Sequence, residues 1–381
     1  MSRVFVVIGT RPEAIKLFPV IHALTARPGI EVVTCVTGQH REMVDQVLAM
    51  AAIRADVDLD LMLPDQTLDQ LTARLIEALG PAIDTARPDL IVVQGDTVSA
   101  MAAALVALYR RLPVAHVEAG LRSGSLHDPC PEEGNRRMIA ALTTLHFAPT
   151  PIAAEALRGE RVSGAVHLTG NTVIDALRLT TQALDRDPAG TAPLRRMLDG
   201  LGDRRIVFTT VHRRESVAAL EGIARALSRI ADRGDAAIVL PVHPNPQVGA
   251  VLHRRLGGHA NIALTGPLDY PNAVTALSRC DIVLTDSGGL QEEAPFFGKP
   301  VLVMRDTTER PEGIMAGTAR LVGTGEDAIV AAAADLLESR ERRDAMATPH
   351  LPYGRGDASG RIASLIDAFL RYRALPIDGR A

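Results

Sequence analysis

Three small residues that follow a buried strand mark the first candidate ligand site in this sequence. The apolar run at residues 281–284 is typical of a strand in a parallel sheet covered on both faces, and Ser287, Gly288 and Gly289 come soon after it. The unsatisfied N–H groups at a helix start carry partial positive charge, so such a turn suits a phosphate group. Ser287 can cap the helix or donate to a phosphate oxygen, and the two glycines let the backbone come close. A well-capped buried crossover would have the same residues, so both interpretations stay open.

The charged residues that follow this turn favour a ligand. Arg305, Arg310, Glu292 and Glu293 all lie within one strand–helix–strand step of it. Glu293 comes one helical turn after Gly289 and therefore lies on the same helix face. A carboxylate there could accept hydrogen bonds from sugar hydroxyls, while Arg310 could meet a phosphate. The sequence therefore predicts a site for a nucleotide-sugar.

Acidic residues follow two further strands in the first half of the chain. Asp96 comes after the apolar run 90–93, and Glu118 comes after the run 114–117. If those strands are neighbours, the two carboxylates face one crevice. Each acid alone could be an ordinary loop acid or helix cap, but two at matching strand ends are less easily explained that way. Glu132 lies in the first turn of a predicted helix, where the helix dipole favours an acid whatever the function.

Cations accompany these acids. Arg11 and Lys16 follow the first buried strand, at residues 4–8, across a turn in which Pro12 begins a helix. Surface Arg and Lys are usually solvated, but two of them near a strand-to-helix turn predict anion contact. His212 lies in a similar turn after the strand at 206–210, in the second half.

The composition limits the class of protein. A length of 381 residues favours two domains, and a net charge of −4 without basic blocks argues against nucleic-acid binding. No apolar run approaches membrane-spanning length, and the first one is too short for a signal peptide. Three widely spaced cysteines suggest neither a disulfide framework nor a metal site. We therefore expect a cytoplasmic protein without a membrane or nucleic-acid partner.

Strands alternate with helices along the chain, which predicts two doubly wound parallel sheets of the α/β class. We expect an N-terminal Rossmann-like domain at residues 1–170, which carries the acids, and a C-terminal Rossmann-like domain at 171–381, which binds the nucleotide. The second half restarts after a polar stretch at 185–203. The last helix, at about 359–373, could pack back on the N-terminal domain. A ligand should lie in a cleft between the two sheets.

The chain closely resembles one family, the non-hydrolysing UDP-N-acetylglucosamine 2-epimerases. The resemblance covers about the whole chain and rests on several motifs that are together very specific. The matching motifs are Gly9–Lys16, Thr37–Arg41, Gln94–Thr97, Val117–Arg122, Pro131–Glu133, Asn135–Arg136, Thr169–Asp175, His212–Glu215 and Leu284–Glu312. One departure is Ala273, which stands where the family usually has a phenylalanine that packs near uracil.

The resemblance implies a glycosyltransferase-B type fold and a reversible reaction at C2 of UDP-N-acetylglucosamine that gives UDP-N-acetylmannosamine for cell-surface polysaccharide. The route is elimination of UDP to a 2-acetamidoglucal, followed by re-addition with the opposite configuration at C2. The resemblance also implies that Asp96, Glu118 and Glu132 are the acid/base carboxylates. It implies that His212 assists the departure of UDP. The positions matched to substrate binding are Arg11, Lys16, Arg136, Ser287, Gly288, Gly289, Glu293 (uridine ribose) and Arg310.

The resemblance also bears on regulation and partners. The family is commonly dimeric, so a homodimer is expected. Some relatives carry an effector site for a UDP-sugar near the positions of Gln39, Gln46 and His243. No cofactor is expected, because proton transfer needs no hydride carrier and the turn at Gly9 lacks the three-glycine dinucleotide fingerprint.

Four other functions remain open from the sequence. A hydrolysing epimerase would release UDP and free N-acetylmannosamine. A glycosyltransferase would hold its donor similarly, but it would leave three carboxylates without an obvious role. A non-catalytic sensor would bind the UDP-sugar without exchange at C2. A modified substrate, such as a UDP-2,3-diacetamido sugar acid, would change the sugar contacts.

Overall fold

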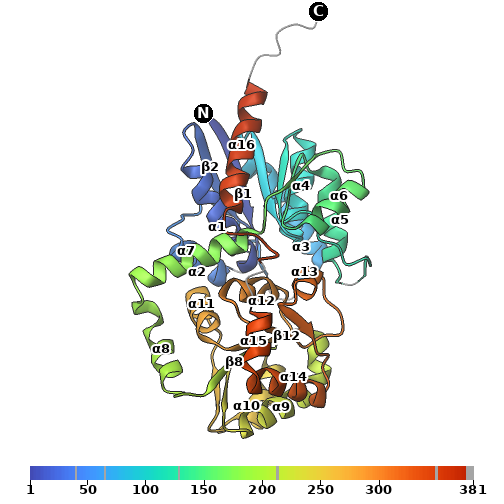
Figure 1. Ribbon diagram of the computed structural model, residues 1–381. Helices are drawn as coiled ribbons and strands as arrows, with labels where there is room; N and C mark the ends of the chain where they lie inside the picture. The colour runs from blue at the N-terminus through green and yellow to red at the C-terminus, as the bar shows by residue number, and fades with distance from the viewer. Residues whose placement is uncertain (39–40, 64–65, 128, 212–213, 348–350, 375–381) are drawn as a thin grey trace, which may run out of the picture. The chain divides into compact units, whose positions relative to one another are not determined.

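The computed structural model describes residues 1–38, 41–63, 66–127, 129–211, 214–347 and 351–374, without the side chains of 214–218 and 373–374. Its chain divides into two compact units (Figure 1). Unit 1 is Met1–Ala176 together with the chain from Tyr353 onward, and unit 2 is Leu177–Pro352.

Unit 1 is built on a parallel sheet of seven strands in the order β3-β2-β1-β4-β5-β6-β7. The strands are β1 (Ser2–Ile8), β2 (Ile30–Val36), β3 (Val57–Asp58), β4 (Leu90–Gln94), β5 (Val114–Val117), β6 (Leu145–Ala148) and β7 (Ala165–Leu168). The helices are α1 (Arg11–Thr25), α2 (Arg41–Met50), α3 (Leu68–Ala86), α4 (Val98–Tyr109), α5 (Glu132–Leu142), α6 (Pro151–Gly159), the first part of α7 (Thr172–Arg186) and α16 (Ala358–Ala374).

Strand β1 shows why this sheet is buried on both faces. Phe5 and Val7 belong to an apolar cluster with residues of α3 and α4. Val4, Val6 and Ile8 alternate with them and are also fully buried, so helices must cover the opposite face as well. The continuous apolar run in the sequence is the direct result of this double coverage.

Unit 2 repeats the plan with six parallel strands in the order β10-β9-β8-β11-β12-β13. The strands are β8 (Arg205–Thr210), β9 (Ala236–Pro241), β10 (Ile262–Thr265), β11 (Ile282–Thr285), β12 (Val301–Val303) and β13 (Ala319–Leu321). The helices are α8 (Ala192–Asp199), α9 (Arg214–Asp232), α10 (Pro246–Leu256), α11 (Tyr270–Arg279), α12 (Gly288–Glu293), α13 (Pro311–Met315), α14 (Glu326–Glu338) and α15 (Arg340–Met346), with 3₁₀ turns at Ala189–Thr191 and Ala294–Phe297.

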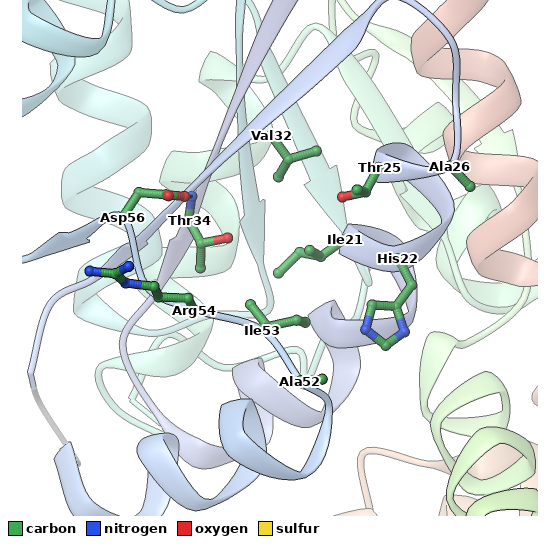
Figure 2. A pocket seen from close by; sticks show the side chains of 10 residues that line it. All are labelled: Ile21, His22, Thr25, Ala26, Val32, Thr34, Ala52, Ile53, Arg54 and Asp56. Atoms are coloured by element: carbon green, nitrogen blue, oxygen red, sulfur yellow. Dashed lines mark hydrogen bonds between the residues drawn. The ribbon is translucent and has the colours of Figure 1, made fainter.

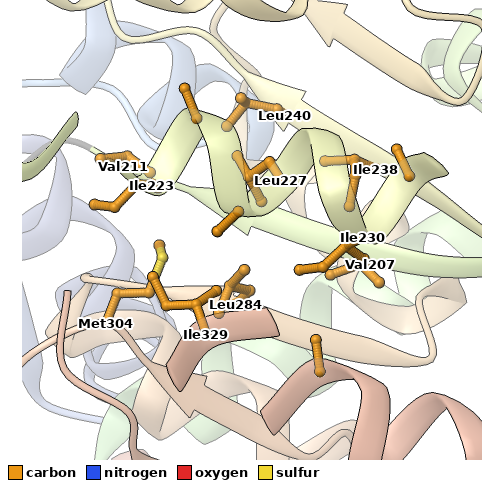
Figure 3. Close-up of a cluster of buried hydrophobic side chains, with 14 of the residues drawn as sticks. Val207, Val211, Ile223, Leu227, Ile230, Ile238, Leu240, Leu284, Met304 and Ile329 are labelled. Atoms are coloured by element: carbon orange, nitrogen blue, oxygen red, sulfur yellow. The ribbon is translucent and has the colours of Figure 1, made fainter. Parts of the chain in front are cut away.

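The core of unit 2 shows how one amphipathic helix covers the sheet. Ile223, Leu227 and Ile230 of α9 pack against strand residues such as Val207 and Leu284 (Figure 3). Their spacing of three to four residues places them on one face of the helix. The polar stretch at 185–203 also holds a helix, α8, because Leu194 and Leu198 lie one turn apart and are both buried.

The strand order creates one switch point in each sheet. In unit 1 the order reverses between β1 and β4, and in unit 2 between β8 and β11. Ligands of doubly wound sheets bind beside the carboxyl ends of the strands at such points. The prediction of two Rossmann-like units in the α/β class is therefore confirmed.

The carboxyl-terminal helix α16, drawn in red in Figure 1, packs against α1 in unit 1. Its start is capped by Asp175 of α7, whose carboxylate accepts hydrogen bonds from the backbone N–H groups of Ala358 (3.2 Å) and Ser359 (2.9 Å). Among the described residues, no helix combines the length and the apolar character that crossing a membrane would require.

Candidate functional site

The two strand-end acids of unit 1 do lie at neighbouring strands. Strands β4 and β5 pair in parallel, with Gln94 opposite Val117, so Asp96 and Glu118 follow at the same edge of the sheet. Glu118 adopts a left-handed backbone conformation with a φ of +63°. A residue other than glycine rarely takes this conformation, and such strain is frequent at functional sites.

Glu118 is a buried carboxylate, 8% exposed, that receives hydrogen bonds from three side chains. Lys16 of α1 donates to Oε1 and forms a buried ion pair with it. Gln94 at the end of β4 donates to Oε2. Asn171, just before α7, donates to Oε1 over 3.3 Å. The ionised carboxylate is thus compensated from three separate segments of the chain.

Asp96 is held differently, by α5. Its Oδ2 accepts a hydrogen bond from Nε of Arg136 over 2.8 Å, and its backbone carbonyl accepts one from Nδ2 of Asn135 over 2.8 Å. The Arg136 side chain is buried and also pairs with Glu133, at 3.3 Å, whereas Asp96 keeps 26% of its side chain exposed. Arg136, predicted as a substrate-binding residue, is therefore engaged with two carboxylates of its own unit.

Glu132, the third predicted acid, is the first residue of α5 and is half-buried. Its Oε2 atom is buried and has no hydrogen-bond partner among the residues that the structure describes. Buried polar atoms are nearly always paired, so an exception calls for an explanation. A carboxylate oxygen in this state can accept from, or exchange a proton with, a group that is not part of the protein.

His116 on β5 supports the turn that carries Asp96. Its Nε2 lies 2.7 Å from the carbonyl oxygen of Gly95. Because a carbonyl can only accept, Nε2 carries the hydrogen. Burial lowers the pKa of His116 to about 4, so the ring is neutral at pH 7. Gly95 itself needs its positive φ of 68°, which glycine tolerates without strain.

The start of α1 places Arg11 and Lys16 near the same edge. Arg11 is the first residue of the helix and is half-buried. The backbone N–H groups of Thr10 (2.6 Å) and Gly9 (3.1 Å), just before the helix, donate hydrogen bonds to Oε2 of the buried Glu13. Glu13 also accepts from the hydroxyl of Thr97 over 2.8 Å, which links the turns after β1 and β4.

Burial raises the pKa of Glu13 to about 7, although its hydrogen bonds oppose the shift. The folded protein therefore binds a proton here that the unfolded chain has lost above a pH of about 4.5, so stability falls as pH rises through this window. We expect Glu13→Gln to remove this dependence. Between pH 5.5 and 8 its free energy of unfolding should rise relative to the native chain by about 2 kcal/mol.

Urea unfolding of both proteins at several pH values measures this difference. Glu160→Gln is the matched control, because hydrogen bonds from Arg122 lower the pKa of Glu160 in the folded protein. Above pH 5.5 Glu160 is therefore ionised in the folded protein, and in the unfolded chain its ordinary pKa of 4.5 leaves it ionised as well. The difference between Glu160→Gln and the native chain should stay constant over that range. A constant difference for Glu13→Gln as well would contradict the prediction.

In unit 2 the predicted phosphate turn lies at the switch point. The hydroxyls of Thr210 and Thr285 are 2.6 Å apart across β8 and β11, and Thr285 also accepts from the N–H of Ser287 over 2.9 Å. Gly288 and Gly289 then begin α12. The turn therefore stands at the edge where ligands of this fold bind.

Arg310 lies directly beside the first glycine. A Cβ atom on Gly288 would be 3.0–3.2 Å from three atoms of the guanidinium group, so any larger residue would push this group aside. The guanidinium is held by Glu292, at 2.9 Å from Nε, and by Glu309, at 2.8 Å from Nη1. Glu309 also pairs with Arg305 at 2.7 Å, so the cation has a defined position beside the turn. Glu293 is half-buried, one turn beyond Gly289.

The remaining predicted residues are less informative. His212 and Gln39 lie outside the described residues. Gln46 is exposed on α2, and His243 is exposed after β9, where its Nδ1 accepts from the N–H of Asn245 over 3.2 Å. Among the residues described, no group of three or more His, Cys, Asp or Glu side chains is arranged to hold a metal ion.

A separate pocket of about 540 Å³ lies in unit 1, between the second half of α1, β2 and residues 52–56 (Figure 2). Ile21, Val32 and Ile53 supply its apolar side chains, and Arg54 and Asp56 are charged residues at its lining. None of the candidate site residues that the structure describes lines it.

Sequence reasoning missed several residues that hold the site. Gln94 and Asn171 stand inside two of the matched motifs, but nothing in their types revealed that both bind Glu118. Glu133 ends the matched motif Pro131–Glu133, but its residue type does not reveal that its side chain is fully buried and paired with Arg136 and Arg137. The sequence feature that could have identified these three residues is their position within polar motifs.

The fold and the two strand-edge clusters define a class of protein, the enzymes with two Rossmann-like domains of the glycosyltransferase-B type. A family model described as UDP-N-acetylglucosamine 2-epimerase matches residues 22–367. The chain belongs to the UDP-N-acetylglucosamine 2-epimerase family, as its motifs predict.

Individual relatives support this assignment. The UDP-N-acetylglucosamine 2-epimerase of Escherichia coli K12 is 46% identical over 369 residues, which cover 94% of this chain and 97% of the relative. The crystal structure of UDP-GlcNAc 2-epimerase from Neisseria meningitidis bound to UDP-GlcNAc is 39% identical with a TM-score of 0.89, covering 97% of this chain and 100% of that one. The S. aureus MnaA–UDP structure is 41% identical with a TM-score of 0.90, covering 97% of both chains.

Proposed function

We propose that this enzyme interconverts UDP-N-acetylglucosamine and UDP-N-acetylmannosamine without net hydrolysis. A carboxylate removes the proton from C2, the bond between C1 and the UDP oxygen breaks, and a C1–C2 double bond forms in 2-acetamidoglucal. UDP then re-forms its bond to C1 while an acid delivers a proton to the opposite face of C2. Atoms and charges balance without an oxidant or cofactor.

The observation that carries this proposal is the pair of acids at one sheet edge. Glu118 is buried against Lys16, Gln94 and Asn171, whereas Asp96 is partly exposed and paired with Arg136. Two titratable groups in such different environments suit opposite roles in proton transfer. Proton exchange on both faces of a carbon requires at least two such groups.

Glu132 is the third acid/base group of the proposal. Its buried Oε2 atom, which no described residue contacts by a hydrogen bond, supports a direct role toward the substrate. His212 assists the departure of UDP, as proton donor or by stabilising diphosphate charge; this role rests on the motif alone, because His212 lies outside the described residues.

The diphosphate is bound by cations and by the glycine turn. In unit 2 we assign it to Ser287, Gly288, Gly289 and Arg310, with Glu293 on the uridine ribose. Arg310 beside Gly288 supports this, because a guanidinium pairs well with phosphate oxygens. In unit 1 we assign Arg11 and Lys16 to the diphosphate as well. Arg136 contributes to substrate binding by holding Asp96, with which it pairs.

Incubation with UDP-N-acetylglucosamine in heavy water tests the reaction. We expect deuterium at C2 in both epimers, read by NMR, and UDP-N-acetylmannosamine as the product. Free N-acetylmannosamine would indicate a hydrolysing enzyme. Binding of the UDP-sugar without any deuterium at C2 would indicate a sensor, and either result would overturn the proposal.

Substitution of Gly288 by Ala tests the phosphate turn. The added methyl group displaces the guanidinium of Arg310, so we expect KM for UDP-N-acetylglucosamine to rise by about tenfold or more, the value of a charge-assisted hydrogen bond. Gly222→Ala on α9 is the matched control, because its methyl group would meet no atom closer than 3.7 Å and Gly222 belongs to neither candidate cluster. Equal KM values for the two variants would argue against Arg310 as a phosphate ligand.

The biological setting belongs to the same proposal. We assign the enzyme to the supply of activated N-acetylmannosamine for cell-surface polysaccharide, as a cytoplasmic homodimer. An effector site for the UDP-sugar at Gln39, Gln46 and His243 is a further hypothesis. Rates that stay hyperbolic in UDP-N-acetylglucosamine would remove it.

A further inference from the structure

We infer that Asn171 is a positioning residue for the acid/base carboxylate of Glu118, an inference that rests on the proposed function. The side chain of Asn171 is 2% exposed, and its Nδ2 donates to Oε1 of Glu118 over 3.3 Å. The resemblance attaches no role to this residue beyond membership of a motif.

The orientation of the Asn171 amide follows from its other contacts. Its Oδ1 atom accepts a hydrogen bond from the backbone N–H of Val173 over 3.1 Å. Only the oxygen can accept, so the amide nitrogen is directed to Glu118, and the carboxylate receives a donor rather than a second acceptor. The backbone N–H of Asn171 donates to the carbonyl of Tyr353 over 2.8 Å, which fixes the residue from the other side.

Asn171 stands where the chain leaves unit 1 and returns to it. Unit 1 ends at Ala176 and resumes at Tyr353, so both links between the units begin within a few residues of this contact. Gly170 and Gly354 lie close together with positive φ values, and a Cβ atom on Gly354 would be 3.2 Å from Cα of Gly170. Asp175 then binds the start of α16 through Ser359. The orientation of Glu118 is therefore tied to the join between these two segments.

The other partners of Glu118 constrain it in different ways. Lys16 reaches it through a flexible four-carbon stem with three rotatable donors, so it neutralises the charge without defining one orientation. Gln94 binds the other oxygen. Asn171 is short, buried and held at three points, so it fixes Oε1 in one position.

Two variants of Asn171 test the inference. Asn171→Asp preserves the shape and the acceptor for Val173 but replaces the donor by a carboxylate oxygen, and Asn171→Ala removes both. We expect kcat for epimerisation to fall by about tenfold to a hundredfold in each, because misplacement of a reacting group by about 1 Å costs this much. KM should change less than about threefold, because the substrate contacts remain. Asn261→Ala, which loses a 3.0 Å hydrogen bond from Nδ2 to the carbonyl of Ala231, is the matched control with unchanged kcat.

A double-mutant cycle separates positioning from general destabilisation. If Asn171 acts through Glu118, Asn171→Ala should cause no further loss in a Glu118→Gln background, whereas a structural role would lower the residual rate by the same factor. Native kcat in both Asn171 variants, the same loss in both backgrounds, or loss of folding in both variants would overturn the inference. If Glu118→Gln alone leaves exchange at C2 unchanged, the proposed role of Glu118 has failed instead.

Discussion

Replacement of Glu118 by Gln is expected to lower the rate of C2 epimerisation by about 10²–10⁴-fold, the usual contribution of a positioned general acid or base. The amide keeps the shape of the side chain but cannot take up or release a proton. Deuterium incorporation at C2 of UDP-N-acetylglucosamine should fall with it, because exchange and epimerisation share the same proton transfer. NMR of the substrate in heavy water measures both.

Glu118→Gln also removes the buried partner of the Lys16 ion pair, so the stability of the variant must be measured as well. Removal of one partner of a buried pair destabilises by about 3–5 kcal/mol. Urea unfolding of the variant, and of Glu118→Gln combined with Lys16→Met, distinguishes the causes: the double variant should regain stability but not activity. Exchange within tenfold of the native rate in a folded Glu118→Gln variant would remove Glu118 from the mechanism.

Replacement of Arg136 by Met is also expected to cause a large loss of stability, about 3–5 kcal/mol. Arg136 is buried between Asp96 and Glu133, and Glu133 is fully buried, so loss of the cation leaves a buried carboxylate poorly compensated. The free energy of unfolding in urea measures the effect. Epimerisation should fall as well, because Asp96 loses the partner that orients it.

Arg137→Met is the matched control for this experiment. Arg137 pairs with the same Glu133, at 3.1 Å, but 46% of its side chain is exposed, so we expect a loss of only about 0–1 kcal/mol. Glu133→Gln combined with Arg136→Met should recover part of the stability, because the uncompensated charge is gone. Equal losses for Arg136→Met and Arg137→Met would show that burial of the Arg136 pair contributes nothing.

Much of the fold follows from local sequence patterns. The apolar runs of β1, β4, β5, β8 and β11 are short and continuous because both faces of each sheet are covered, and such runs predict buried parallel strands without further information. The glycine turn after β11 and the acids after β4 and β5 could be found in the same way, since ligands bind at strand ends. Helix α8 could not be recognised so easily, because only two buried leucines distinguish it from a polar linker.

The partners of the candidate residues could not be predicted from these patterns. Lys16 could be recognised as a cation near a strand end, but its pairing with Glu118 joins residues 102 positions apart. Arg136 belongs to a motif matched to substrate binding, but its contact with Asp96 depends on how α5 packs against α4 and β5. Such contacts depend on strand order and helix packing, which local patterns leave open.

The sequence by itself determined the class of fold, the motifs that identify the family, and the positions of Asp96, Glu118 and Ser287 at the ends of strands. These features depend on residue type, periodicity and spacing, which act over a few residues. Only the tertiary structure decided which groups meet there: Asn171 against Glu118 and Tyr353, Arg136 between two acids, and Arg310 above Gly288. The physical reason is that compensation of a buried charge depends on which distant segments packing brings within hydrogen-bond distance of it.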